Sequence, residues 1–127
     1  MDVAGILCTS LERTIYDLAR LVSAEVALAS ADAALARIGG DPRDYDERAA
    51  DEWLAAIGVR LDTNAGARGI RHARLLMPLV DGRSQLPLES VTKLQLRRLG
   101  FNQPRLQVPV AAPTGGSFWM GVELEEA

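Results

Sequence analysis

Hydrophobic residues recur at helical spacing in five stretches between residues 11 and 99 of the chain. They lie three or four positions apart, as one face of an amphipathic helix requires. The stretches are approximately Leu11–Val22, Ser23–Ile38, Asp46–Val59, Ala67–Val80 and Pro87–Leu99. Thr9–Glu12 has the form of a capping box, and Gly39-Gly40 follows the second stretch as a stop. The pattern predicts five helices.

The hydrophobic spacing changes from helical to alternating after residue 104. Every second residue is apolar on both sides of a turn at Pro113–Gly116, which predicts a β-hairpin. The alternating residues are Leu106, Val108, Val110, Phe118, Met120, Val122 and Leu124. A short apolar run, Gly5–Thr9, predicts a strand before the first helix. The expected fold is therefore α+β and predominantly helical, with a short N-terminal strand and a C-terminal hairpin.

The predicted hairpin needs support, because an isolated two-stranded ribbon is at best marginally stable in water. It could pack on the fifth helix, pair with Gly5–Thr9, or pair with another chain. The sequence ends soon after the second strand, which favours an incomplete domain. A homodimer formed through the hairpin is one way to cover the open edge.

Composition places the chain among ordinary globular proteins. With 127 residues, 48% hydrophobic and 24% charged, it fits one domain, or one domain and a fragment of another. A single cysteine, Cys8, excludes an internal disulfide, and its apolar neighbours favour a buried structural thiol over a reactive one. The N-terminus has no signal-peptide pattern and no segment is apolar enough for a membrane span, so a cytoplasmic location is expected.

Charge is distributed unevenly along the chain. Residues 1–65 hold 12 acidic and 6 basic side chains, a balance of −6, whereas residues 66–107 hold 8 basic and 2 acidic ones, a balance of +6. The basic segment could attract a polyanion, or it could bind the acidic half of its own chain. The candidate phosphate-binding residues are Arg68, Arg71, Arg74, Lys93, Arg97 and Arg98.

Two parts of the chain resemble known families. The segments TSLERTIYDLAR (residues 9–20) and ASADAAL (residues 29–35) are similar to the C-terminal part of AbiEi-type antitoxins. Residues 66–110, with the tail GGSFWMGVELEEA, resemble the opening of a nuclease-like domain akin to the very-short-patch-repair endonuclease, of the PD-(D/E)XK type. The resemblance implies an AbiEi-like helical region, 1–64, and a truncated restriction-endonuclease-like region, 65–127, packed as one unit.

The resemblance implies that the nuclease site is degenerate. Such enzymes hold Mg²⁺ with several acidic residues from a helix and adjacent strands. Glu89 matches the helix acid, but the strand aspartate falls on Gly121, and the Glu-x-Lys strand would lie beyond the last residue. Glu123 is two residues away on the same strand face, roughly 7 Å along the strand, too far to replace it. Glu89 and Glu123 are therefore only vestigial candidates, and no catalytic residue, metal or cofactor is expected.

The other side chains that could take part in chemistry have simpler structural explanations. Glu89 and Lys93 lie four residues apart, with the acid first, which favours a helix-surface ion pair. His72 is the only histidine and is remote in sequence from Cys8, so neither a zinc site nor a catalytic dyad is expected. Asp17 and Arg20 are expected to fix helix packing or a turn.

The sequence supports three hypotheses for function. The first is a non-catalytic interaction module that binds a protein partner, for example a toxin, or itself. The second is a nucleic-acid-binding protein that uses the basic segment 66–107, and the third is an Mg²⁺-dependent nuclease. AbiEi-type antitoxins carry an N-terminal winged helix, and nothing before Gly5 could form one, so operator binding by that route is not expected.

Overall fold

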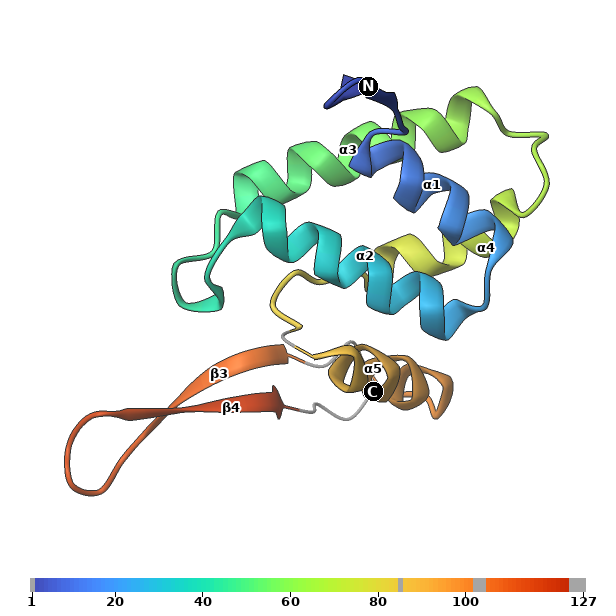
Figure 1. Ribbon diagram of the computed structural model, residues 1–127. Coiled ribbons are helices and arrows are strands. Elements are labelled where there is room, and N and C mark those ends of the chain that lie inside the picture. Colours follow the sequence, from blue (N-terminus) through green and yellow to red (C-terminus); the bar gives the residue numbers. More distant parts are fainter. Residues whose placement is uncertain (1, 85, 102–104, 124–127) are drawn as a thin grey trace.

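The computed structural model describes residues 2–84, 86–101 and 105–123 and shows a predominantly helical α+β fold (Figure 1). The prediction of fold class is confirmed. The helices are α1 (Leu11–Leu21), α2 (Ala24–Gly39), α3 (Glu47–Thr63), α4 (Ile70–Leu76) and α5 (Pro87–Arg98), with 3-10 turns η1 (Pro42–Asp44) and η2 (Met77–Leu79). The strands are β1 (Asp2–Val3), β2 (Ile6–Leu7), β3 (Arg105–Ala111) and β4 (Ser117–Glu123).

Helix α2 lies at the centre of the fold and packs against the other four helices (Figure 1). Seven of its 16 residues are alanine, which lets neighbouring helices approach closely. The buried residues of all five helices form one hydrophobic cluster, which includes Leu94 of α5. The buried residues of α2 include Ala27, Leu28, Ala31 and Leu35, while Val26 in the first turn is exposed.

Helix α1 begins at Leu11, as predicted, but its capping residue lies one position later than the capping box indicates. Ser10, and not Thr9, is the N-cap, because its Oγ accepts a hydrogen bond from the amide of Arg13 at 3.2 Å. The Thr9 hydroxyl instead lies 2.6 Å from that of Thr14. Glu12, which the capping box would direct back to Thr9, pairs with Arg60 of α3.

The fourth helix is much shorter than the expected Ala67–Val80. Gly69 has a left-handed backbone, φ +79°, and its α-carbon lies so close to the carbonyl of Arg20 that an added Cβ would be 2.1 Å from that oxygen. At the other end, Pro78 has no amide hydrogen to donate, and the chain tightens into η2. The chain therefore turns sharply on both sides of α4.

Two separate antiparallel hairpins stand outside the helical cluster. In the described residues β1 pairs with β2 and β3 pairs with β4, and the two ribbons form separate sheets. Pairing of the C-terminal hairpin with the N-terminal strand is therefore excluded, while its support by α5 or by another chain stays a prediction. The turn at Pro113–Gly116 is confirmed by the bond from the Ala112 amide to the carbonyl of Gly116. Leu124 lies outside the described residues.

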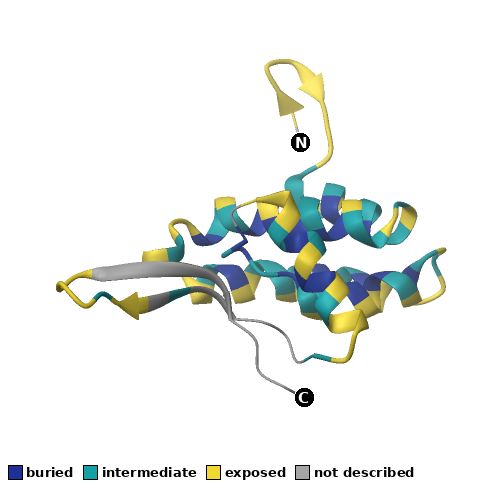
Figure 2. Ribbon diagram, turned by 90° about the horizontal axis from the view of Figure 1, so that it is seen from below, coloured by how far each residue is buried: buried dark blue, intermediate teal, exposed yellow. Residues whose placement is uncertain are grey.

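The expectation of a buried Cys8 is wrong. Cys8 follows β2 and is exposed, because the β1–β2 hairpin projects from the helical cluster with its residues exposed (Figure 2). None of the helices in the described ranges is long and apolar enough to cross a bilayer.

A buried ion pair beneath a groove on helix α2

Asp32 is the one acidic side chain on the buried face of α2. It lies among Leu28, Ala31 and Leu35 and is only 1% exposed. A buried carboxylate loses its hydration, so it needs hydrogen-bond donors and a compensating charge from the protein. The fold brings such groups from α5 and from the loop between η2 and α5.

Three donors converge on the Asp32 carboxylate. The Lys93 Nζ of α5 donates to Oδ2 at 2.8 Å, and the Ser90 hydroxyl donates to the same oxygen at 2.6 Å. The amide of Asp81 donates to Oδ1 at 2.7 Å. Lys93 is 0% exposed and also lies 3.4 Å from the hydroxyl of Ser84. The network joins α2, α5 and the 81–84 loop through interactions between residues far apart in sequence.

The electrostatics of this network suit a structural role. Burial raises the pKa of Asp32, while the Lys93 charge and the hydrogen bonds from Lys93, Ser90 and Asp81 act in the opposite direction. The positive and negative charges lie next to each other, and both Asp32 oxygens accept hydrogen bonds. The network can therefore fix α5 on α2, and its charged groups are directed at each other.

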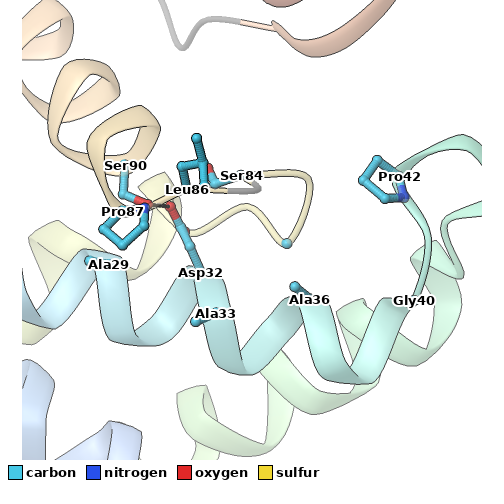
Figure 3. A pocket seen from close by; sticks show the side chains of 11 residues that line it. Ala29, Asp32, Ala33, Ala36, Gly40, Pro42, Ser84, Leu86, Pro87 and Ser90 are labelled. Atoms are coloured by element: carbon cyan, nitrogen blue, oxygen red, sulfur yellow. Dashed lines mark hydrogen bonds between the residues drawn. The ribbon is translucent and has the colours of Figure 1, made fainter. Parts of the chain in front are cut away.

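An open groove of about 330 Å³ runs along α2 beside this network (Figure 3). Small residues of α2 form its floor, and Pro42, Leu86 and Pro87 contribute walls from the flanking segments. Asp32, Ser84 and Ser90 contribute polar atoms at one end. The α2 residues in its lining are Ala29, Asp32, Ala33, Ala36 and the C-cap Gly40. The volume lies at the lower end of the range for small-ligand sites and would hold a few side chains of a partner.

The loop that borders the groove is held from its other side. A Cβ on Gly82 would lie 2.5 Å from the Tyr45 hydroxyl and 2.9 Å from the amide nitrogen of Ala36, so only glycine fits there. Arg83 lies over the Tyr45 ring, 4.5 Å from its centre, and pairs with Glu47. Burial raises the pKa of Tyr45, so its hydroxyl stays neutral at ordinary pH. The groove wall is thus fixed to α2 and α3.

The expected phosphate-binding residues do not form one free basic surface. The expectation that Lys93 lies on the surface is wrong, because α5 turns this residue toward Asp32 in α2. Arg74 pairs with Asp62, and Arg98 pairs with Glu25 at 2.7 Å. The basic segment is therefore bound in part to the acidic half of the chain, one of the two outcomes considered from the sequence.

Three of the expected phosphate-binding residues keep their cationic groups at the surface. Arg68, Arg71 and Arg97 are exposed, and no ion pair involving them is seen in the described part of the chain. The Nη1 of Arg97 donates to the carbonyl of Phe101 at 3.3 Å, so among the described residues the guanidinium has a hydrogen-bond acceptor but no carboxylate partner.

The vestigial nuclease acids occupy separate elements. Glu89 lies in the first turn of α5, where its Oε2 accepts a long hydrogen bond from the amide of Leu86. Glu123 ends β4 opposite Arg105. The expected Glu89–Lys93 pair is replaced by the Asp32–Lys93 pair. Within the described residues, no group of three His, Cys, Asp or Glu side chains could hold a metal ion.

Asp17 and Arg20 have the packing roles expected of them, and His72 also contacts a neighbouring helix. Arg20 donates to Asp17 at 3.1 Å and to the carbonyl of Arg68 at 2.8 Å, which fixes α1 to the turn before α4. His72 lies 2.9 Å from the carbonyl of Ala19. Burial acts to raise the pKa of Asp17, but hydrogen bonds and charge from Arg13 and Arg20 outweigh it and hold that pKa below its usual value.

The central ion pair was not predicted from the sequence, although one signal for it was present. Asp32 interrupts the Ala-rich buried stripe of α2, and a charged residue in such a stripe requires a partner. The spacing in α5 made Glu89 the expected partner of Lys93.

The chain is similar to two known proteins over less than half of their length. The chain is 32% identical over 117 residues to the uncharacterized proteins MT2308 and Rv2248, from two strains of Mycobacterium tuberculosis. The alignment covers 92% of this chain but 38% of each relative, so the chain spans less than half of their length. No protein-family profile matches the chain, and no solved structure gives a significant match.

Proposed function

We propose that this chain is a non-catalytic interaction module that binds a segment of a protein partner, or of a second copy, in the groove along α2. The proposal keeps the resemblance to AbiEi-type antitoxins and truncated nuclease-like proteins, which would make a toxin one class of partner. The observation that carries it is the pairing of Asp32 with Lys93 beside an open, largely apolar groove.

Three properties of the groove support binding over catalysis. Its ionisable neighbours, Asp32 and Lys93, are directed at each other and not at the open space. Its floor of small side chains lets another backbone approach closely, and its walls carry Pro42, Leu86 and Pro87. The groove is therefore suited to a docked segment recognised mainly by shape.

Site-specific photo-crosslinking in cells that express the chain tests this proposal. A diazirine amino acid at Ala33, which is exposed and lines the groove, should give a discrete adduct. The same amino acid at Ala55, exposed on α3 outside the groove, is the matched control. Mass spectrometry of the adduct identifies either another protein or the chain itself. Absence of a position-33 adduct, together with a monomeric solution mass, would contradict the proposal.

A second candidate function is nucleic-acid binding, and the exposed charges of Arg68, Arg71 and Arg97 favour it. Phosphate contacts by these groups would give affinity that falls steeply with salt. Arg71→Glu should then weaken duplex DNA binding, while Arg48→Glu on α3 should change it less. Equal effects of the two substitutions would mean a general charge effect and no defined site.

A further inference from the structure

We propose that a second groove, between α4 and α5, docks an acidic amphipathic helix of a partner protein. This groove shares no lining residue with the groove along α2 and has a volume of about 340 Å³. We name it the leucine–arginine groove after the residues that line it, which are Ala24, His72, Leu75, Leu76, Leu79, Leu94, Arg97 and Arg98.

The apolar part of the leucine–arginine groove joins the hydrophobic core to the surface. Leu76 and Leu94 are buried, and Leu79 is half-buried against the core. Leu75 is 78% exposed on α4. Leucines at this range of depths offer an incoming apolar side chain contact on several sides, which is how a groove recognises the anchor residues of a helix.

The rim of the leucine–arginine groove is basic. Arg97 and Arg98 line it on the α5 side. Arg98 pairs with Glu25, while Arg97 has no carboxylate partner among the described residues. A partner with carboxylates beside its apolar anchors would compensate these charges.

The position of Leu75 favours an acidic helix over a nucleic acid. Phosphate contacts would use the arginines but would leave Leu75 and the apolar floor of the groove exposed to water. An amphipathic helix with leucines on one face and glutamates at its borders would use both features together. The combination of an exposed leucine and an exposed arginine at one groove is therefore the observation that favours an acidic helix.

A synthetic peptide provides a direct test on the full chain. The probe is a fluorescein-labelled helix with leucines at positions i, i+3, i+4 and i+7 and glutamates on the remaining face. Binding is measured by fluorescence anisotropy at low and high salt. We expect saturable binding that weakens several-fold at high salt, because part of the attraction is between screened surface charges. A peptide with glutamines in place of the glutamates, and one with serines in place of the leucines, should bind more weakly.

Substitutions in the protein locate the peptide. Leu75→Ser and Arg97→Glu should each weaken binding by about tenfold. The matched controls are Leu88→Ser, also an exposed leucine, on α5 outside the groove, and Arg48→Glu on α3, and both should leave binding unchanged. All four residues are at the surface, and thermal unfolding confirms that each variant is folded.

Three results would overturn the proposal. They are no binding of any peptide, equal binding of the glutamate and glutamine peptides, and binding that Leu75→Ser does not change. If duplex DNA binds with an affinity that Arg97→Glu lowers and Leu75→Ser leaves alone, while the acidic peptide does not bind, the surface is a nucleic-acid site instead. Replacing Ala33 by Trp fills the α2 groove and not the leucine–arginine groove. If Ala33→Trp weakens peptide binding, the peptide binds in the α2 groove.

Discussion

The buried pair formed by Asp32 and Lys93 makes a quantitative prediction about stability. Lys93→Met removes the ammonium and keeps a side chain of similar length. Asp32→Asn keeps an oxygen that can accept from the amide of Asp81 but removes the negative charge. Each single substitution leaves one charge buried without its partner, and such changes cost about 3–5 kcal/mol.

The two single variants should differ in a definite order. In Lys93→Met the carboxylate keeps its hydrogen bonds from Ser90 and Asp81. Because burial already raises the pKa of Asp32, protonation can relieve the remaining charge, and the cost should fall near the lower limit, about 3 kcal/mol. In Asp32→Asn the Lys93 ammonium, which is 0% exposed, loses its counter-charge, and the cost should be about 5 kcal/mol.

The double variant, with Asn at 32 and Met at 93, distinguishes an ion pair from two independent residues. It leaves no buried charge, so we expect it to be at most about 2 kcal/mol less stable than the wild type. Urea unfolding followed by circular dichroism at neutral pH gives the free energies. The double variant should therefore be more stable than the sum of the single effects predicts, by at least about 6 kcal/mol.

A surface pair provides the control. Arg48 and Glu52 lie one turn apart on α3, 2.9 Å from each other, with most of both side chains exposed. The same cycle with Arg48→Met and Glu52→Gln should give a coupling of no more than about 0.5 kcal/mol. If the effects of the Asp32 and Lys93 substitutions are additive to within about 0.5 kcal/mol, the reasoning from burial is refuted.

Three further predictions follow from local features. Ser10→Ala should lower the free energy of unfolding by about 1 kcal/mol through loss of the α1 cap, measured by urea unfolding, with no change in the unfolding slope. Gly69→Ala should lower the free energy of unfolding by at least about 2 kcal/mol, because an alanine there has φ +79° and meets the carbonyl of Arg20. A urea-unfolding midpoint equal to that of the wild type would contradict the close approach of Gly69 to Arg20. The pKa of Asp17 is lowered in the folded state, so its ionised carboxylate stabilises the fold above its usual pKa, and this stabilisation is lost as pH falls. The stability difference between the wild type and Asp17→Asn should therefore shrink between about pH 5 and about pH 2.

The spacing of apolar residues was sufficient to predict the five helices, because a helix buries one face whatever it packs against. The ends of α1 and α4 were harder to place. Glu12 pairs with Arg60 of α3 and not with the Thr9 amide, and the start of α4 depends on how closely Gly69 approaches Arg20. Both are contacts between segments far apart in sequence, which local patterns do not report.

The candidate site was less predictable than the helices, for the same physical reason. The sequence assigned Lys93 to the surface because Glu89 lies one turn before it. Which face of α5 is buried depends on its packing against α2. That packing buries Lys93, and its ammonium pairs with the buried carboxylate of Asp32 and not with Glu89. The arginines were easier to place, since charged side chains reach the surface in most environments.

Two features of α2, its alanine-rich surface and the buried Asp32, together account for a charged pair in the core of this fold. An alanine-rich helix presents a nearly featureless surface, so apolar packing alone would let α5 settle in several alignments along it. In the structure Asp32 accepts from Lys93, Ser90 and Asp81, and we expect this set of bonds to select one alignment, the one that also sets the wall of the α2 groove. We therefore expect the variant with Asn at 32 and Met at 93 to keep its helices but to lose a unique α5 position, in line with other polar groups that specify packing. Amide NMR spectra check this: broadened or doubled α5 resonances are expected, and a single sharp set matching the wild type would mean that apolar packing alone positions the helix.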